Sequence, residues 1–500
     1  MKIEEKCNGR KPIYSCYSEI TDENICDVIR NAYKIHLFNQ KQINYLHRYL
    51  KGYQPILNRV KDIRPEINNK IVENHALEIN NFKVGFMFGE PVQYVRRGDC
   101  NIDPKNTETN NIALLNEYMQ FDNKSSKDRE LAEWFNKCGV GYKIVLPSDS
   151  SDQPFETYVL DPRYTFIVRS NDFKHEPVLG VTYVKNKDFD KNIFYEATVY
   201  SKQYSWKIIY RNQKYQILDK KINNLGEIPI IEYRNNPDMI GSFENVLPLC
   251  DAINTITSNS IDGIEQVIQA LIWFNNCQIS NDNFKALRDV GAIQTKSDVT
   301  APADIKVIKT DLNQTETQVI KDDLYQKMLT IASVPDRRAS AGGNTGQALI
   351  IGEGWVMAES SAKALEPLFI SSEKQLLKIV LKICKDTKNV SDELKNIELH
   401  DIEVKFTRNK TDNLLVKTQA LMNLLQAGIH PRIAIAYCGL FSDPEQVYQD
   451  SKETLEKIAK GETSDINEVI GKSDIIDDDP LNDEVIKLVD KLQGVNNADK

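Results

Sequence analysis

The chain has 500 residues, of which 41% are hydrophobic and 27% charged, and its formal net charge is −9. These values are ordinary for a globular protein, so they exclude a mostly disordered, collagen-like or purely coiled-coil chain. The length predicts roughly three domains. The acidic balance excludes a strongly basic nucleic-acid clamp, because tight phosphate binding needs an excess of lysine and arginine over the contact surface.

Cysteine and histidine lack the spacing of a metal site or a disulfide framework. The nine cysteines are an odd number with no CxxC pair, and the six histidines form no HExxH or HxH motif. The pattern indicates a reducing compartment, and we expect no disulfide, metal or cofactor. The charged N-terminus has no apolar segment after it and predicts no signal peptide. The longest apolar runs, such as residues 270–274, are far too short to span a bilayer, so we expect no membrane partner.

The first half of the chain is predicted to be an α+β region ending near residue 240. Apolar residues at helical spacing predict helices over residues 20–80, with interruptions at Pro55 and Pro65, and over 111–137. Residues 69–87 are predicted to be a helix running into a strand. Segments rich in β-branched and aromatic residues predict short strands in sequential antiparallel hairpins. These strands are residues 91–96, 142–146, 157–160, 165–168, 178–184, 194–200 and 205–210.

The second half begins with a predicted helical hairpin. Apolar residues three and four apart predict a long helix over residues 245–274, with Asn254, Ser258 and Asp262 among the polar residues between them. A compact segment, 275–312, separates this helix from the next, 313–335. The two helices therefore enclose a small separate module at the tip of the hairpin.

The remaining elements follow in order. Residues 336–346 form a loop of small residues, and residues 347–385 form a helix that Pro367 should kink. A strand is predicted over residues 397–407, and at least two helices over 411–460, separated at residues 428–431. The acidic tail from residue 466 is expected to be poorly ordered.

The loop contains the first candidate site. Gly342, Gly343, Asn344 and Thr345 precede a helix, an arrangement that can bind phosphate. A nucleotide-binding P-loop requires lysine and a hydroxyl residue after the last glycine, whereas Gly346 is followed by Gln347. The pattern therefore favours a flexible connection between two helices.

Two acidic residues form the second candidate site. Asp401, Glu403 and Lys405 alternate, so all three should lie on one face of the predicted strand. Metal-dependent nucleases use a similar grouping, in which the acids hold a cation. Apolar residues alternate with them, which is more typical of the solvated face of a half-buried strand. A nuclease using Asp401 and Glu403 stays as the alternative function.

Basic residues near the hairpin form the third candidate. Arg337 and Arg338 precede the loop of small residues. Other cations lie between the two helices: Lys285, Arg288, Lys296 and Lys306. Scattered lysines usually face solvent, but on loops facing nucleic acid they would make weak, non-specific phosphate contacts.

Several short segments in order resemble the portal proteins of tailed bacteriophages, of the long-tailed (siphovirus) type. The resemblance covers roughly residues 20–460. Its segments are NKIV at 69–72, GFMFGEPVQY at 85–94, DPRY at 161–164, IPIIEYRNN at 228–236, GSFE at 241–244, DAIN at 251–254, SVPD at 333–336 and TGQAL at 345–349.

The resemblance implies a portal fold with named parts. These are an α/β wing (1–244), two stem helices (245–274 and 313–335), a small α/β clip (275–312), a channel or tunnel loop (336–346), a kinked channel-lining helix and strand that complete the wing (347–410), a helical crown (411–465) and an acidic, disordered tail (466–500). An adaptor, another kind of head protein, would lack the long hairpin.

The resemblance also implies a function without catalysis. Copies of the chain would form a ring, expected to be a dodecamer, at one capsid vertex of the virion, after assembly in the host bacterial cytoplasm. The implied partners are further copies of the chain, double-stranded viral DNA held without sequence specificity, the terminase large subunit, a head-completion or adaptor protein, and the major capsid and scaffold proteins.

The resemblance assigns roles to the candidate residues. Arg337, Arg338, Gly342, Gly343, Asn344 and Thr345 would belong to the DNA-channel loop. Lys285, Arg288, Lys296 and Lys306 would be clip residues that contact terminase or the adaptor. A ring of acidic chains would broadly repel DNA, which suits a conduit through which DNA must slide. The polar faces of the stem helices are expected to face neighbouring copies and the channel.

Overall fold

The computed structural model divides into two compact units, Met1–Asn409 and Lys410–Lys500. The fold mixes helices and sheets, as predicted. The residues that it describes are 9–17, 19–97, 111–150, 152–187, 193–211, 214–268, 271–275, 304–308, 314–336, 354–388, 390–406, 408, 414–438, 447–448 and 451–452.

The first unit contains a six-stranded sheet built mainly from consecutive hairpins, as predicted. Its strands are β1 (Ile13–Ser15), β5 (Thr165–Ser170), β6 (Pro177–Lys187), β7 (Ile193–Tyr200), β8 (Tyr204–Arg211) and β9 (Lys214–Ile222), in that order across the sheet. Strands β5 to β9 pair antiparallel, whereas β1 pairs parallel with β5. The sequence patterns missed β9 because most of its side chains are exposed.

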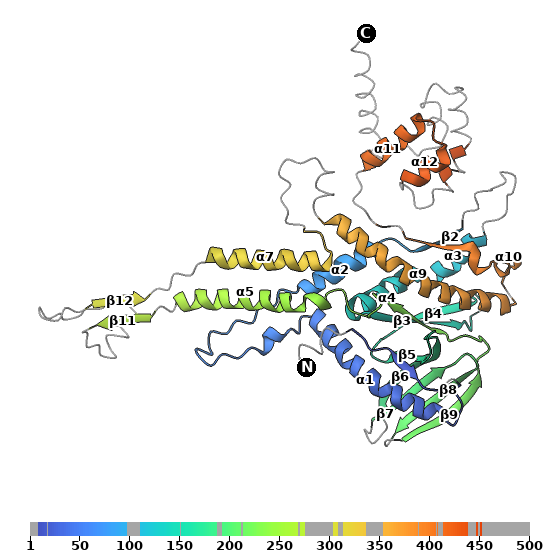
Figure 1. Ribbon diagram of the computed structural model, residues 1–500, viewed down its shortest axis with the longest axis horizontal. Helices are drawn as coiled ribbons and strands as arrows, with labels where there is room; N and C mark the ends of the chain where they lie inside the picture. Colours follow the sequence, from blue (N-terminus) through green and yellow to red (C-terminus); the bar gives the residue numbers. More distant parts are fainter. Residues whose placement is uncertain are drawn as a thin grey trace, which may run out of the picture. The chain divides into compact units, whose positions relative to one another are not determined.

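Helix α1 (Ile25–Leu50) packs on this sheet through its apolar face (Figure 1). Ile25 and Ile29 lie in one buried cluster with Phe166 and Trp206 of the sheet. The long helical prediction over residues 20–80 was wrong in its middle part. Residues 51–74 hold only the short 3₁₀ helix η2 (Pro55–Asn58) before α2 (His75–Phe88), because proline lacks the amide hydrogen that a helix interior needs.

A second sheet and the helices around it form the centre of the first unit. The sheet has the order β10 (Ile230–Arg234), β3 (Val140–Pro147) and β4 (Phe155–Leu160). The helices nearby are α3 (Asn111–Phe121), α4 (Lys124–Cys138) and α9 (Trp355–Asp386). Gly139 ends α4 with a φ of 81°, and a β-carbon there would lie 1.9 Å from the carbonyl oxygen of Met239, so only glycine fits.

A buried polar network crosses this centre. Glu373 on α9 accepts hydrogen bonds of 2.6 Å from the hydroxyls of Tyr94 and Tyr233, and Lys124 lies 2.9 Å from the same carboxylate. Lys143 on β3 lies 2.5 Å from Asp128. Two lysines thus meet two carboxylates, all four with buried side chains, which fixes α9 against α4 and β3.

The predicted helix over 347–385 and strand over 397–407 are partly confirmed. Helix α9 contains Pro367, and residues 347–353 lie outside the described part of the chain. The strand is shorter than predicted: α10 (Asp392–Lys395) and the 3₁₀ helix η4 (Leu399–Asp401) precede β13 (Ile402–Lys405), which pairs antiparallel with β2 (Gln93–Arg96).

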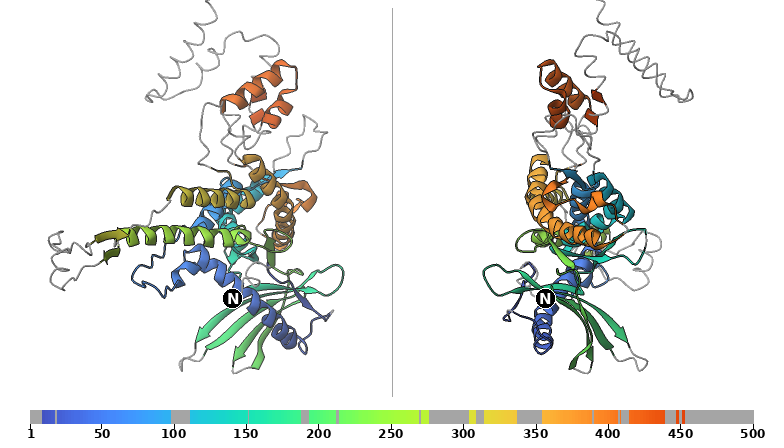
Figure 2. Two further views of the ribbon diagram at one scale, coloured as in Figure 1. Left: turned by 60° about the vertical axis from the view of Figure 1, so that its left-hand side comes forward. Right: turned by 90° about the vertical axis from the view of Figure 1, so that its right-hand side faces the viewer.

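The predicted helical hairpin is present (Figures 1 and 2). After η3 (Glu244–Val246), helix α5 (Leu247–Ile268) lies beside α7 (Gln314–Ala332). The helix predicted over 245–274 ends six residues early. Leu271–Asn275 is strand β11, which pairs antiparallel with β12 (Asp304–Ile308). Its sequence, with Ile272, Trp273 and Phe274, has a high strand propensity.

The second unit contains α11 (Leu414–Gln426) and α12 (Pro431–Cys438). They are separated where predicted, since Gly428 takes a φ of 81° and Pro431 begins the next helix. The acidic tail, residues 466–500, lies outside the described residues. Within the part of the chain that the structure describes, no helix has the length and apolar character needed to cross a bilayer.

Candidate functional site: a helical hairpin held by a polar ladder

An apolar seam joins the two helices of the hairpin. The sulfur of Cys250 on α5 lies 3.5 Å from that of Met328 on α7, and both side chains are buried. The apolar spacing of each helix predicted this seam. Ile320 and Ile331 of α7 do not belong to this seam and keep 55% and 58% of their surface exposed in the single chain.

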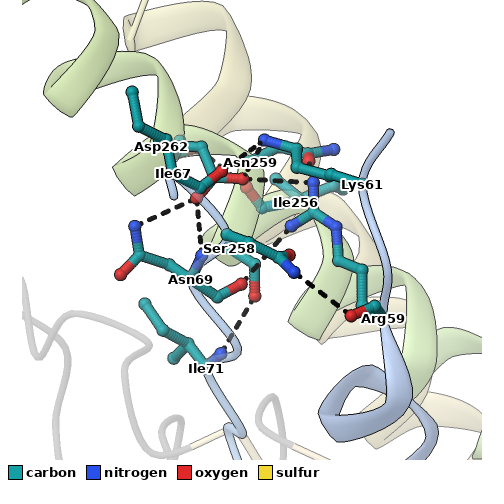
Figure 3. Close-up of polar contacts among 11 residues, drawn as sticks. Arg59, Lys61, Ile67, Asn69, Ile71, Ile256, Ser258, Asn259 and Asp262 are labelled. Carbon is teal, nitrogen blue, oxygen red and sulfur yellow. Dashed lines mark hydrogen bonds and ion pairs between the residues drawn. The ribbon is translucent and has the colours of Figure 1, made fainter. Parts of the chain in front are cut away.

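A ladder of three hydrogen bonds runs along α5, and Figure 3 shows two of them, those donated by the amides of Asn69 and Ile71. Asn69 N donates to Asp262 Oδ1 at 2.8 Å and Ile71 N to Ser258 Oγ at 3.0 Å. The third bond runs from Glu73 N to Asn254 Oδ1 at 2.7 Å. We call these contacts the polar ladder. All three acceptor side chains on α5 are buried.

The ladder depends on a match between two backbone repeats. Four residues of an α-helix advance about 6.0 Å, and side chains four apart share a face. Two residues of extended chain advance about 6.6 Å. Alternate amides of residues 69–73 can therefore meet every fourth side chain of α5. Backbone groups that have no strand or helix partner are thus satisfied by side chains.

Cations surround the Asp262 end of the ladder. Lys61 Nζ lies 2.5 Å and Arg59 Nη2 3.1 Å from Asp262 Oδ2. Burial alone would raise the pKa of Asp262, but the hydrogen bonds from Lys61 and Asn69 outweigh it and lower that pKa. The carboxylate therefore stays charged, and its contacts hold the loop before α2 against α5.

The Asn254 end is anchored by amides. Asn254 Nδ2 donates to Gln54 Oε1 at 2.5 Å, and Gln54 Nε2 donates to Asn74 Oδ1 at 3.0 Å. Gln54 and Asn254 are both buried. A buried amide without partners is costly, so this pairing fixes the register of residues 54–74 on α5.

A charged cluster connects the ladder to α7. Lys321 Nζ lies 2.5 Å from Glu73 Oε1, and His75 Nε2 lies 3.3 Å from Glu73 Oε2. His75 Nδ1 lies 3.0 Å from Glu78, whose other oxygen accepts a 2.9 Å hydrogen bond from Tyr325. The segment between α1 and α2 is thereby fixed to both helices of the hairpin.

Two pKa values in this cluster are displaced. The pKa of Glu73 is lowered to about 2. The largest cause is the hydrogen bond with His75, which outweighs burial, and hydrogen bonds with Lys321 and Thr257 lower this pKa further. Burial opposes the charged imidazole of His75, but hydrogen bonds to Glu73 and Glu78 outweigh it and raise the pKa of His75. The cluster is thus most favourable with His75 protonated and both carboxylates ionised.

Comparison with known proteins identifies the family. Residues 31–461 match the family described as "Phage portal protein, SPP1 Gp6-like". The chain belongs to this family. It is 26% identical over 263 residues to the portal protein of Bacillus phage SPP1, a match that covers 51% of this chain and 50% of that protein. The chain thus matches about half the length of this curated relative.

The family match confirms the resemblance seen in the sequence. Portal proteins are structural, non-enzymatic components of the capsid. The matched range includes the hairpin and the whole polar ladder. The contacts at α5 are therefore considered as parts of a capsid protein's framework and not as a catalytic centre.

The residues assigned to portal loops lie mostly outside the described part of the chain. Residues Arg337, Arg338, Gly342, Gly343, Asn344 and Thr345 of the predicted channel loop lie outside the described residues, as do Lys285, Arg288 and Lys296 of the predicted clip. Lys306 lies in β12, opposite Trp273 of β11.

The acidic pair of the nuclease alternative is not arranged as expected. Asp401 belongs to η4 and not to the strand, and its carboxylate accepts a 3.0 Å hydrogen bond from the amide of Glu398 in a capping box. Glu403 lies in β13 opposite Val95. Among the described residues, no group of three or more His, Cys, Asp or Glu side chains could hold a metal ion.

The polar face of α5 also differs from expectation. Asn254, Ser258 and Asp262 were expected to face neighbouring copies or the channel, but they are buried beneath residues 69–73. Sequence patterns missed the ladder partners at residues 54–74. The available signal was the regular spacing of three polar residues, four apart, along one side of an amphipathic helix.

Proposed function

We propose that copies of this chain assemble into a ring at one capsid vertex, through which viral DNA is packaged and later leaves. The family match over residues 31–461 is the observation that carries this proposal. The helical hairpin supports it, because a ring with a central channel needs a long element that every copy can present to the axis. The expected ring is a dodecamer of identical subunits.

The parts of the fold are given portal roles under this proposal. The first unit up to residue 244, with residues 347–410, would be the wing, and 411–465 the crown. Helices α5 and α7 would be the stem. The pairing of β11 with β12 supports a clip over 275–312 that is a module distinct from the stem helices. The tail, 466–500, has no assigned role.

Exposed apolar side chains support contact between stems. Val319, Ile320 and Ile331 of α7 are exposed in the single chain, and so is Ile264 of α5. Apolar residues on both helices of a narrow hairpin are suited to packing against the hairpins of neighbouring copies. The net charge of −9 would limit adhesion of DNA to the assembled channel.

We assign the partners from the same family role. The clip, with Lys285, Arg288, Lys296 and Lys306, would contact the terminase large subunit and later a head-completion or adaptor protein. The channel loop, with Arg337, Arg338, Gly342, Gly343, Asn344 and Thr345, would contact passing DNA. Major capsid and scaffold proteins would contact the wing, after assembly in the host cytoplasm.

Deletion of residues 341–345 tests the channel assignment. We expect the deleted chain to form rings of normal size but to yield heads with little packaged DNA. The comparison is with the unaltered chain in the same packaging reaction, scored by nuclease-protected DNA. Normal head filling would contradict the assignment of this loop.

A separate variant tests the clip. Reversing the charges of Lys285 and Arg288 should weaken binding of the purified ring to terminase and leave ring formation unchanged. Unchanged affinity for terminase would overturn the assignment of these two residues.

A further inference from the structure

A cavity of about 320 Å³ lies in the first unit between α2, α9 and the end of α7. Its walls combine the rings of Phe82 and Phe86 with the neutral polar side chains of Asn136, Ser242 and Ser361. Of the described residues that line it, Lys83 is the one cation, and none is Asp or Glu. The cavity therefore holds a positive charge that its own walls do not neutralise.

The contacts of the half-buried Lys83 differ from those of the buried Lys124 and Lys143. Its Nζ donates a 3.1 Å hydrogen bond to Ser361 Oγ, and no carboxylate of the described residues lies within ion-pair distance. Lys124 and Lys143, in contrast, each contact Asp128. Burial lowers the pKa of Lys83 to about 8, because no nearby anion offsets the loss of solvent.

The lining matches a carboxylate ligand. A partly buried ammonium gains most from an anion that forms a charge-assisted hydrogen bond. Hydroxyl and amide groups of Ser361, Ser242 and Asn136 lie on the same walls and offer neutral polar contacts. The volume suits one or a few side chains. It is far too small for a DNA duplex, whose major groove alone is about 12 Å wide.

We propose that this cavity receives an Asp or Glu side chain from a second copy of this chain, which pairs with Lys83. The inference rests on the proposed ring, because only an assembly supplies the second copy. Charge supports this occupant, since the chain has 72 acidic against 63 basic residues. In a closed ring each subunit presents the same surface to its neighbour, so every Lys83 would gain a partner.

Carbodiimide cross-linking of mixed rings tests the contact. Unlabelled chain and chain labelled with heavy nitrogen are assembled together, and the reagent joins a carboxylate directly to a lysine amine. We expect peptides containing Lys83 to be linked to an acidic peptide in mixed light–heavy pairs, in the ring fraction only. Lys374, an exposed lysine of α9, is the control and should give no such specific product.

Each other outcome has a definite meaning. If every cross-link at Lys83 joins two light peptides or two heavy peptides, the carboxylate lies in the same chain and the proposal is overturned. Mixed products at other lysines but none at Lys83 would also overturn it. Protection of Lys83 by added DNA, and not by ring formation, would likewise overturn it. A chain that forms no ring would contradict the proposed function itself.

Substitution gives a second, independent test. Lys83→Met should lower the yield of rings about tenfold at fixed concentration relative to Lys374→Met, because loss of one partner leaves a carboxylate buried without its cation. The single Lys83→Met chain should unfold at the same temperature or higher, since an unpaired ammonium is removed. Lys83→Arg should retain most ring formation. Equal ring yields for the two methionine variants would overturn the proposal.

Discussion

The backbone amide of Asn69 donates a 2.8 Å hydrogen bond to Asp262, a residue 193 positions away in the sequence. The same carboxylate contacts Lys61 and Arg59, so one side chain of α5 binds a backbone amide and two cations. Asp262 is itself almost fully buried. The hairpin of this portal protein is therefore fixed to the rest of the first unit at a position where a single substitution should be costly.

Asp262→Ala should destabilise the chain by about 2–4 kcal/mol, because it leaves the Asn69 amide without its acceptor and removes the anion that pairs with Lys61 and Arg59. Chemical denaturation of the purified chain measures this free energy of unfolding. Asp323→Ala is the matched control, since Asp323 forms an exposed ion pair with Lys327 on α7 and should cost about 0.5 kcal/mol or less. Equal losses in the two variants would contradict the role of the ladder.

Ser258→Ala tests the middle contact of the ladder. Loss of the hydroxyl leaves the Ile71 amide without its acceptor, which should cost about 1–2 kcal/mol and speed hydrogen exchange at that amide. Ser260→Ala changes the same helix but removes only a bond to the carbonyl of Ile256, so its effect should stay within about 0.5 kcal/mol. Slow exchange of Ile71 in Ser258→Ala would count against the ladder.

The Glu73–His75–Glu78 cluster should make the hairpin sensitive to pH. The raised pKa of His75 contributes stability that is complete below its ordinary value of 6.5 and is lost as pH rises through the folded value. The lowered pKa of Glu73 contributes stability that is complete above 4.5 and is lost as pH falls toward about 2. Protection of residues 69–78 from hydrogen exchange, corrected for intrinsic rates, should therefore be greatest between about pH 4.5 and 6.5.

His75→Gln is the control for the upper limit of this window. Without the imidazole, the decline in protection on the alkaline side should disappear, whereas the decline on the acidic side should persist in weaker form. If the unaltered chain and His75→Gln follow the same alkaline profile, another group causes the change.

Glu373→Gln tests the buried network at the centre of the first unit. Burial alone would raise the pKa of Glu373, but the charges of Lys124 and Lys143 and hydrogen bonds from Tyr233 and Tyr94 hold it low. The glutamine side chain is uncharged, so Lys124 and Lys143 keep only Asp128 as a carboxylate partner in the network. The free energy of unfolding should therefore fall by about 3 kcal/mol. Thermal unfolding provides the measurement, and an unchanged melting temperature would show that the charge of Glu373 is not needed.

Local periodicity predicted that the two helices would pair, but it did not predict every residue of the seam, because Ile264, Ile320 and Ile331 follow the repeat and are exposed in the single chain. The apolar positions of α5 and α7 follow the helical repeat, and Cys250 and Met328 meet where that repeat places them. The end of α5 was not predictable in this way. Residues 271–275 have apolar character that suits a helix or a strand, and pairing with β12, about thirty residues later, decides between the two.

The ladder could not be predicted because polarity does not distinguish a solvated side chain from a buried one with a partner. In the sequence, Asn254, Ser258 and Asp262 have the pattern of the solvent-exposed face of an amphipathic helix. Their hydrogen-bond partners are about two hundred residues away in the chain. Lys83 is hidden for the same reason. A lone lysine on a helix normally faces solvent, and only the tertiary structure shows the cavity around it.

Electron microscopy of the purified full-length chain tests the central claim most directly. We expect closed rings with an axial hole wide enough for a DNA duplex, and reconstructed density in which α5 and α7 of each copy surround that hole. Monomers at every salt concentration, or rings in which the two helices lie away from the axis, would contradict it.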